Sequence, residues 1–552
     1  MSAGTESQSL ESATTSIESQ PDQKTRRYDR QLRLWAKSGQ AALESAHLLV
    51  LSSSSTSTSI LKNLVLPGVG QFTLLDRTIT SPSDAGNNFF LEGLDSVGKP
   101  RAEEAVRLLL ELNDGVKGHS IVEKDIQQVL SSEGESGVEW VKGFSLIIAH
   151  NLEKNALDQL SDLLWADFKS PPLVIIRSAG FLAEVFIQFH EHAIIDSHID
   201  STPSLRIDKP FPALLERSLA IDFENLDVTD HGHVPYVFIL VRVLEEWKKS
   251  HDGNPPSTAA EKKEFKSLIL NMRKKSDEEN FEEAESQAYK CWTSTVVPSD
   301  IKSLFASSAS SSNTPPHTKP FHILVKALEV YTSTVPPNTL PLSSTLPDMK
   351  ASTKEYVEIQ RLYKDRSVEE KNTFKGILAN VIKEQGEDPN LIDDETIDSF
   401  VKNSHVLRLL SGKKWGWVDE DKAALTERAQ TSSKQLGIHL ALSALSSLHA
   451  KHAQAQATKQ SQEGQNADFT PSLEELTAEA KAILPDGVEL PEEDFDNAIG
   501  EAARSPTADL PNTAALLGGV VAQEVIKMIT KQYVPIDGYC TIDLVETWTG
   551  VL

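Results

Sequence analysis

The chain has 552 residues, of which 39% are hydrophobic, so it is long enough for about three or four folding units with sizeable cores. Its formal net charge of −26 argues against non-specific binding to nucleic acid or to anionic membranes. Its two cysteines argue against a disulfide framework or a cysteine-based zinc site. They fit a reducing compartment, so we expect the protein in the cytoplasm, the nucleus or both.

The N-terminal segment 1–24 is rich in Ser, Glu and Thr and poor in apolar residues, which predicts a disordered tail without a secretory signal. Order is expected to begin at about Arg26 and to continue as a helix. Short apolar strands and amphipathic helices then alternate, which is typical of a doubly wound, Rossmann-like α/β domain. The predicted strands are 47–51, 71–76, 144–149, 173–177 and 184–189.

After about residue 206 the pattern becomes mainly helical. Two segments of low complexity interrupt it, a Ser/Pro-rich one at 307–320 and a Gln/Ala-rich one at 453–471. The α/β pattern then returns, with a helix that Asn512 would cap and a final strand at 539–545.

A nucleotide's phosphates sit at the first strand–loop–helix turn of such a fold, because glycines there let the backbone approach them. Here the turn reads Ser52-Ser-Ser-Ser-Thr-Ser-Thr-Ser59, and the Cβ atom at every position penalises that approach. Asp76 ends the second strand, where an acid would bind ribose, but an acid at a strand end is common. We expect a degenerate loop with a vestigial Asp76; the loop residues are Ser52, Ser53, Ser54, Ser55 and Thr56.

Four motifs, in their order and spacing, resemble the ubiquitin-like-modifier activating enzymes, which have a ThiF/MoeB-like fold. They are Tyr28-Asp-Arg-Gln-Leu-Arg-Leu-Trp35, Leu61-Lys-Asn-Leu-Val-Leu-Pro-Gly-Val-Gly70, Asp84-Ala-Gly-Asn-Asn-Phe-Phe90 and Gly518-Gly-Val-Val-Ala-Gln-Glu-Val-Ile-Lys527. Within that family the chain is more similar to the regulatory, non-catalytic subunits of neddylation-activating enzymes, the amyloid-precursor-protein-binding type. Arg206-Ile-Asp-Lys-Pro-Phe-Pro212 adds to this likeness, which spans about 28–552.

The resemblance implies a division of labour between two subunits. A catalytic partner subunit would bind ATP and magnesium, adenylate a NEDD/Rub-type modifier, hold it as a thioester and pass it to a conjugating enzyme. This chain would form a heterodimer with that subunit, bind no cofactor or metal itself and have no nucleic-acid or membrane partner. Gly86 and Asn87 stand where the active half has an Asn–Arg pair, and Ala149-His-Asn-Leu152 lacks the magnesium-binding aspartate.

The same resemblance implies a pseudo-adenylation domain split by a large insert. We expect its first part at 25–205 and its last helix and strands at 506–552. Between them, 206–505 would be a mainly helical insert related to the catalytic-cysteine domain but lacking the cysteine.

Arg30 matches, by the resemblance, an arginine that the family sends across the dimer interface to the partner's ATP, where a guanidinium would neutralise triphosphate charge. It could instead be a surface arginine in a basic cluster. The apolar helix at 514–529 contains Gly518 and Gly519, which allow close helix approach, so it is either an interface helix or a core helix. The interface candidates are Arg30, Trp35, Asn87, Asn88, Phe89, Gly518, Gly519 and Gln523.

Other features carry weaker signals. Cys291 lacks the sequence setting of the family's catalytic cysteine, and we expect both it and Cys540 to be buried thiols. His231 and His233 form a pair without a second ligand set, so we expect a structural role. The alternatives left open are the regulatory subunit of the SUMO branch, an autonomous adenylating or dinucleotide-dependent enzyme, and a pure adaptor.

Overall fold

A computed structural model describes residues 22–131, 136–199, 202–310, 314–458 and 469–552. The described chain forms two compact units. The helical unit comprises 195–314 and 318–408, and the α/β unit comprises 22–194, 315–317 and 409–552. The predicted disorder of 1–21 lies outside the described residues, whereas Asp22 caps a short helix, α1 (Gln23–Arg27), so order begins earlier than expected.

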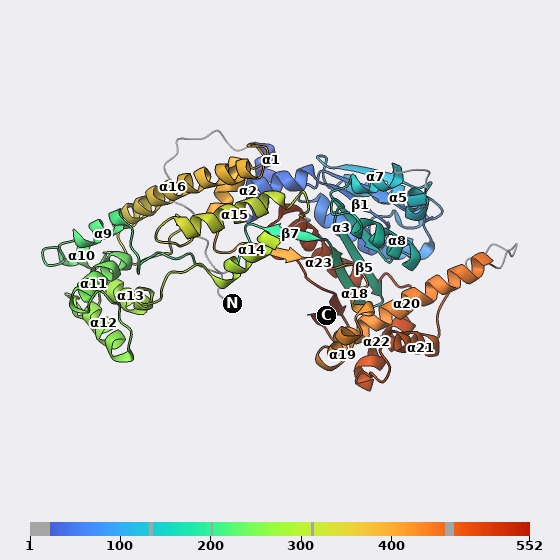
Figure 1. Ribbon diagram of the computed structural model, residues 1–552. Helices are drawn as coiled ribbons and strands as arrows, with labels where there is room; N and C mark the ends of the chain where they lie inside the picture. Colours follow the sequence, from blue (N-terminus) through green and yellow to red (C-terminus); the bar gives the residue numbers. More distant parts are fainter. Residues whose placement is uncertain (1–21, 132–135, 200–201, 311–313, 459–468) are drawn as a thin grey trace. The chain divides into compact units, whose positions relative to one another are not determined.

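An eight-stranded sheet forms the centre of the α/β unit, with strand order β10-β9-β6-β5-β4-β1-β2-β3 (Figure 1). Neighbouring strands from β1 to β5 are parallel, and the pairs β5–β6, β6–β9 and β9–β10 are antiparallel. The predicted α/β class is therefore confirmed, with an antiparallel extension. The strands are β1 (His47–Val50), β2 (Gln71–Leu75), β3 (Lys117–Ile121), β4 (Leu146–His150), β5 (Leu173–Ala179), β6 (Leu182–Gln188), β9 (Cys540–Asp543) and β10 (Trp548–Val551).

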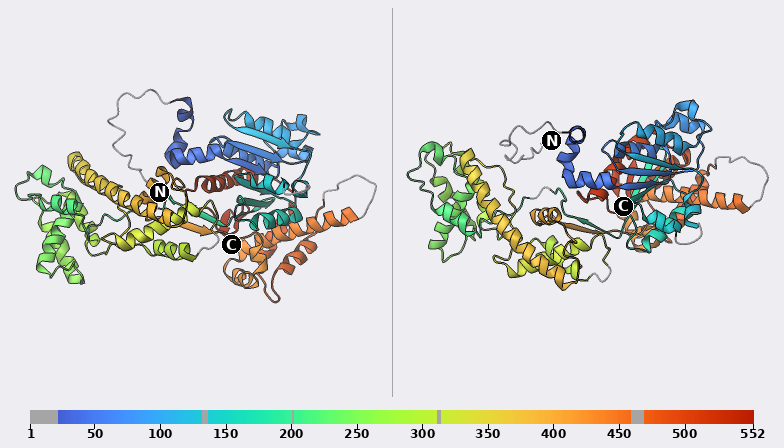
Figure 2. Two further views of the ribbon diagram at one scale, coloured as in Figure 1. Left: turned by 45° about the horizontal axis from the view of Figure 1, so that its top comes forward. Right: turned by 90° about the horizontal axis from the view of Figure 1, so that it is seen from above.

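Both faces of this sheet are covered, because successive side chains of a strand point to opposite faces and here both sets are apolar (Figure 1, Figure 2). Leu48 and Val50 belong to one core, with residues of α3, α5 and α23, and Leu49 belongs to the other, with residues of α8, α20 and α22. The helices of this unit are α2 (Asp29–Ser45), α3 (Ser55–Val65), α4 (Pro82–Asn87), η2 (Gly93–Ser96), α5 (Arg101–Leu110), α6 (Ile126–Ser131), α7 (Ser136–Lys142), α8 (Lys154–Trp165), α18 (Trp417–Glu420), α19 (Lys422–Thr431), α20 (Ser433–Thr458), α21 (Leu473–Ile483), α22 (Glu492–Arg504) and α23 (Pro511–Thr530).

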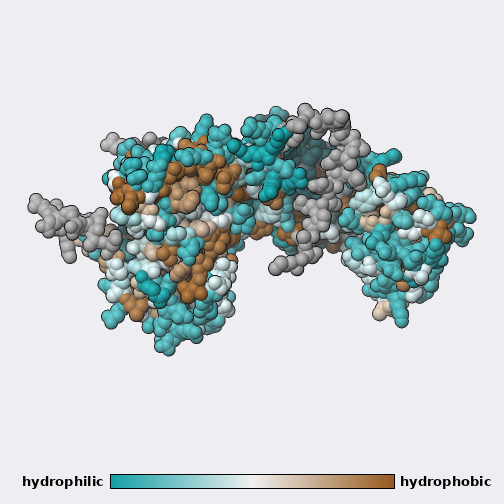
Figure 3. Space-filling view, turned by 180° about the vertical axis from the view of Figure 1, so that it is seen from behind, coloured by the Kyte–Doolittle hydropathy of each residue, from teal (hydrophilic) through white to brown (hydrophobic). Residues whose placement is uncertain are grey.

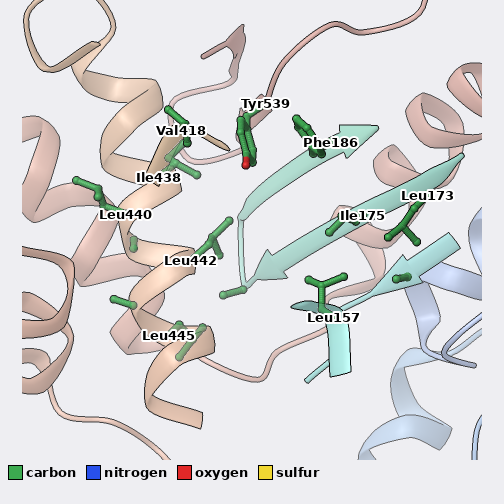
Figure 4. Close-up of a cluster of buried hydrophobic side chains, with 14 of the residues drawn as sticks. Leu157, Leu173, Ile175, Phe186, Val418, Ile438, Leu440, Leu442, Leu445 and Tyr539 are labelled. Atoms are coloured by element: carbon green, nitrogen blue, oxygen red, sulfur yellow. The ribbon is translucent and has the colours of Figure 1, made fainter. Parts of the chain in front are cut away.

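The structure divides the chain differently from the prediction at 409–505. This segment was expected in the helical insert, but it belongs to the α/β unit. Figure 4 shows the reason: Leu440, Leu442 and Leu445 of α20 share one buried cluster with Ile175 and Phe186 of the sheet. Without α20 this face of β5 and β6 would expose its apolar side chains to water.

The helical unit has its own apolar core, which includes Phe238, Phe265, Phe281 and Tyr363. A buried ion pair supplements it, because both guanidinium nitrogens of Arg206 lie 2.7 Å from the carboxylate of Glu370. The helices are α9 (Pro212–Leu219), α10 (Val228–His231), α11 (Tyr236–Ser250), α12 (Ala259–Asn271), α13 (Glu279–Gln287), η3 (Ala288–Cys291), α14 (Ser299–Ser310), α15 (Lys319–Thr334), α16 (Thr353–Glu384) and α17 (Asp394–Lys402). Strands β7 (Glu191–Ile194) and β8 (Arg408–Ser411) form a separate two-stranded sheet, and all of it except Arg408 belongs to the α/β unit.

Two local predictions also need correction. The last long helix, α23, begins at Pro511 after the N-cap residue Leu510, so Asn512 does not cap it. The segments 307–320 and 453–471 are partly helical where the structure describes them, since α14 runs to Ser310 and α20 runs to Thr458. The remaining residues of these two segments include 311–313 and 459–468, which lie outside the described residues.

Candidate functional site

The candidate site is the turn between β1 and α3, at the carboxyl ends of the parallel strands, where open α/β sheets bind their ligands. Helix α3 begins inside the Ser/Thr run, with Ser54 as its N-cap. The hydroxyl of Ser54 accepts a hydrogen bond of 3.1 Å from the backbone N–H of Ser57. This helix end, which binds phosphate in related folds, therefore donates to one of its own side chains.

Asp76 follows β2 and lies against this turn, as predicted. Its carboxylate accepts hydrogen bonds from the backbone N–H of Ser53 at 2.7 Å and from the Ser53 hydroxyl at 2.5 Å. It also forms an ion pair of 2.9 Å with Arg101, the first residue of α5. The acid that would bind ribose is thus engaged inside the unit.

Arg101 is the functional residue that the sequence did not reveal. Its guanidinium bridges Asp76 and Asp84, at 2.9 and 2.6 Å, and donates to the Ser53 hydroxyl at 3.0 Å. The side chains of Arg101 and Asp76 are only 12% and 9% exposed. An arginine after Pro100 at a helix start carries no sign that it reaches back across 25 residues, because that contact is tertiary.

The interactions among Arg101, Asp76 and Asp84 favour the ionised form of both carboxyl groups. Burial acts to raise the pKa of Asp76, but the charge of Arg101 and hydrogen bonds from Ser53 and Thr78 lower it to about 2. Burial likewise acts on Asp84, whose pKa is lowered by hydrogen bonds from Ser81 and by Arg101. The positive charge of Arg101 therefore compensates the negative charges of both carboxylates.

His150 ends β4, close to where the resemblance places a magnesium-binding aspartate. Its Nδ1 lies 2.7 Å from the Ser54 hydroxyl, and its Nε2 lies 2.8 Å from the Ser178 hydroxyl. Burial lowers the pKa of His150, against the charge of Asp509, so the imidazole is neutral at neutral pH. A neutral ring between two hydroxyls donates one hydrogen bond and accepts the other, which leaves it saturated.

Several other hydroxyls of the turn also bond within the unit. Thr56 donates to Asp509 at 2.6 Å, and Ser55 donates to the backbone carbonyl of Asn87 at 3.0 Å. Thr58 donates to the side chain of Asn88 at 2.9 Å, and Asn88 in turn donates to the carbonyl of Ser53. The turn and the strand ends around it therefore form one connected polar network, whose members bond to one another.

The predicted interface residues fall into two groups. Trp35, Asn88 and Gly518 are buried within the α/β unit, which differs from the interface position expected for them. A Cβ atom on Gly518 would lie 2.8 Å from Cβ of Ser59, so this glycine serves the packing of α23 on α3. The other five line the surface or are half-buried; they are Arg30, Asn87, Phe89, Gly519 and Gln523.

Arg30 is exposed on α2, and in the part of the chain that the structure describes it forms no ion pair or hydrogen bond. Its neighbour one turn later, Arg33, pairs instead with Asp29 at 3.1 Å. Phe89 is 87% exposed, the largest value among the bulky apolar side chains that are described. A view from behind shows apolar residues gathered in patches on the α/β unit (Figure 3).

The other candidates behave as structural residues. Cys291 and Cys540 are buried, and burial raises the pKa of both thiols, that of Cys540 to about 11. His231 is buried at 2.8 Å from Glu278 and stacks on Phe281. Within the described ranges no group of three or more His, Cys, Asp and Glu side chains is arranged to hold a metal ion.

Helix α23 is the one described helix that is long and apolar enough to cross a membrane by length and composition. Its residues Leu517, Val521 and Val525 are fully buried in the core shared with α3 and the sheet. These contacts identify it as a core helix of the α/β unit.

Comparisons with known proteins agree with this geometry. The family model described as ThiF matches residues 28–153, which include the Ser/Thr turn, Asp76 and His150. The fold and the family match together define the chain as a ThiF-type α/β protein. Among solved structures, PaaA overlaps a part of the chain, with a TM-score of 0.26, 18% identity and coverage of 32% of this chain and 57% of that one, which carries no functional argument.

Relatives match over nearly the full length. The NEDD8-activating enzyme E1 regulatory subunit of Xenopus laevis is 31% identical, covering 93% of this chain and 95% of that protein. The regulatory subunit AXL of Arabidopsis thaliana is 33% identical, with 92% and 95% covered, and that of Saccharomyces cerevisiae is 24% identical, with 93% and 96% covered. The chain belongs to the family of NEDD8-activating enzyme E1 regulatory subunits.

Proposed function

We propose that this chain works as the non-catalytic half of a heterodimeric NEDD8-activating enzyme. It supports ATP-dependent adenylation of the modifier and thioester formation, both of which take place on a catalytic partner subunit. It binds neither ATP nor magnesium itself, and it acts in the cytoplasm, the nucleus or both.

One observation carries this proposal: Arg101 forms ion pairs with Asp76 and Asp84 at the strand ends where a ThiF-type domain would hold ATP. A nucleotide would have to break buried ion pairs whose partners would then be left unpaired, which is strongly unfavourable. The neutral His150 offers no negative charge to a magnesium ion. The residues present therefore do not fit ATP with magnesium.

The catalytic subunit is the partner that this arrangement needs. We place its contact on the surface that carries Arg30, Phe89 and the exposed stripe of α23 with Gly519 and Gln523. Phe89 gives that surface an apolar group, since an exposed phenyl ring gains much from burial. Arg30 then reaches the partner's ATP and neutralises charge on the triphosphate.

The catalytic partner subunit binds the modifier and the conjugating enzyme. We propose a NEDD8-type modifier because the relatives that match over nearly the full length carry that name. The SUMO-branch alternative has no such support. An autonomous enzyme is disfavoured by the occupied strand ends.

Two measurements test the proposal. Titration calorimetry of the isolated subunit with ATP and magnesium is expected to give no binding heat, whereas binding by the lone chain would overturn it. Co-expression with a NEDD8-activating catalytic subunit is expected to yield a heterodimer that forms a NEDD8 thioester on the partner. Thioester formation on this chain, or equal activity of the partner without it, would also contradict the proposal.

A further inference from the structure

We propose that Asn113 is a positioning residue that holds the segment bearing Arg30, and this inference rests on the proposed role of Arg30. The segment 22–35, called here the Arg30 arm, comprises α1 and the first half of α2. Asn113 lies far away in sequence, after α5, and contacts the arm at two residues.

A bend separates the arm from the rest of α2. Trp35 has φ −127° and ψ 20°, and Ala36 has φ 57° and ψ −174°, so the helix is kinked there. The backbone angles of Ala36 lie in a region that glycine adopts and other residues rarely do. An uninterrupted helix therefore does not fix the direction of the arm, and contacts with other elements must do so.

Asn113 supplies the central contacts. Its amide nitrogen donates to the Tyr28 hydroxyl at 2.9 Å and to the backbone carbonyl of Val65 at 2.8 Å. Its amide oxygen accepts from Arg27 at 2.9 Å and from the N–H of Gly115 at 3.1 Å. With two hydrogens donated and two lone pairs used, the side chain is fully satisfied and locked between the arm and α3.

The contact is buried, as is the packing of Trp35 at the other end of the arm. Asn113 is 2% exposed and Tyr28 is 5% exposed. Tyr28 lies so close to Gly68 that a Cβ atom there would be 2.6 Å from its hydroxyl oxygen, and Gly68 has φ +89°. Close packing around the Tyr28 ring thus allows it one position.

The outer attachments are surface ion pairs, Arg27 with Asp114 at 2.6 Å and Lys24 with Glu44 at 2.7 Å. Exposed pairs of this kind contribute little to stability and are screened by salt. Trp35 fixes the arm where it joins the rest of α2, and the buried amide of Asn113 is therefore the attachment that fixes its outer part at Arg27 and Tyr28.

Arg30 follows Tyr28 by two residues and points away from the buried side of the arm, since it is exposed while Tyr28 is buried. A guanidinium on a fixed arm can stabilise a transition state without first being ordered, whereas a loose arm must lose entropy on every cycle. Asn113 therefore acts on the reaction only through Arg30.

A double-mutant cycle tests this. The heterodimer with the catalytic subunit is assayed by ATP–pyrophosphate exchange with Arg30→Ala, Asn113→Ala, both substitutions, and the milder Tyr28→Phe. We expect Arg30→Ala to lower kcat by at least about tenfold, Asn113→Ala by about three- to tenfold, and the double variant to match Arg30→Ala alone. Two substitutions are the matched controls and should leave the rate unchanged. Arg33→Ala removes a like charge from the same arm, and Asn225→Ala removes an exposed amide elsewhere in the chain.

Hydrogen exchange supplies a readout independent of activity. Asn113→Ala and Tyr28→Phe should speed exchange in 29–35 while β1, β2 and β4 keep the wild-type protection. The inference is overturned if Asn113→Ala slows the reaction by the same factor in the wild-type chain and in the Arg30→Ala chain. It is also overturned if Arg30→Ala slows the reaction but Asn113→Ala changes neither the rate nor the hydrogen-exchange protection of the arm. If Arg30→Ala itself has wild-type kcat, the proposed contact of Arg30 with ATP is what fails, and the positioning role fails with it.

Discussion

The guanidinium of Arg101 lies 2.9 Å from the carboxylate of Asp76, and the two side chains are only 12% and 9% exposed at the carboxyl ends of the parallel strands. This pair joins the start of α5 to the end of β2. Loss of this pair should therefore lower the stability of the α/β unit.

Replacement of Arg101 by Ala should lower the free energy of unfolding by about 3 kcal/mol, because it leaves the largely buried Asp76 and the half-buried Asp84 without their cation. Urea denaturation at pH 7 measures the effect. The exposed pair Lys24–Glu44 is the control, since Lys24→Ala should change the free energy by no more than about 0.5 kcal/mol. Equal effects of the two substitutions would contradict the buried ion-pair network.

The same pair predicts an acid dependence. The pKa of Asp76 is lowered from 3.8 to about 2 in the folded chain, so its contribution is complete above about pH 4 and is lost as the pH falls towards 2. A shift of this size corresponds to about 2 kcal/mol. Unfolding of Asp76→Asn, followed over the same range, should have a shallower slope against pH than the wild type; parallel curves would count against it.

A second buried group predicts a dependence at alkaline pH. His439 of α20 lies between Glu184 at 2.6 Å and Asp419 at 2.9 Å. Burial acts to lower the pKa of His439, but the two carboxylates raise it from 6.5 to about 9. The raised pKa means that the stabilisation is present below about pH 6.5 and is lost as the pH rises through about 9.

His439→Gln should therefore be less stable than the wild type by about 2–3 kcal/mol at pH 6, and the difference should shrink at pH 9.5. Guanidinium denaturation at the two pH values is the measurement. A difference that stays constant with pH would show that the imidazole is not the titrating group.

Ala36 predicts a stabilising substitution. Its φ of 57° and ψ of −174° cost an alanine about 1–3 kcal/mol, whereas glycine adopts them freely and loses about 0.5–1 kcal/mol through its greater freedom when unfolded. Ala36→Gly should raise the free energy of unfolding by about 1 kcal/mol, and Ala36→Val should lower it. Thermal unfolding of the two variants is the measurement. A lower melting temperature for Ala36→Gly than for the wild type would exclude backbone strain at the bend.

Substitutions at the two neighbouring glycines of α23 test two different roles of this helix, packing within the subunit and binding of the partner. Gly518→Val should destabilise the isolated subunit by about 1–3 kcal/mol, because its side chain would clash with Ser59. Gly519 has open space around it, so Gly519→Trp should leave the thermal midpoint of the isolated subunit unchanged and weaken co-purification with the catalytic subunit. Intact co-purification of Gly519→Trp would remove this stripe from the proposed interface.

Much of the fold could be predicted because its signals are local. The apolar runs at 47–51, 71–76 and 173–177 correspond to β1, β2 and β5, since buried parallel strands need continuous apolar side chains. The change to a helical pattern after 206 was also local. The end of that region was not local. The apolar sequence of α20 indicates that the helix is buried, as 436–445 are, but it does not indicate that the sheet is its partner.

The candidate site also has features that the sequence alone predicts and features that depend on the tertiary structure. Sequence alone determined that the turn at 52–59 lacks the glycines of a phosphate loop and that no carboxylate stands at Ala149-His-Asn-Leu152, because these are properties of residue type at one place. Only the tertiary structure decided that Arg101, Asp509 and Asn88 would meet at that turn. Side chains from distant segments come together when the sheet and its helices close around a shared core, and their hydrogen-bonding partners depend on that geometry.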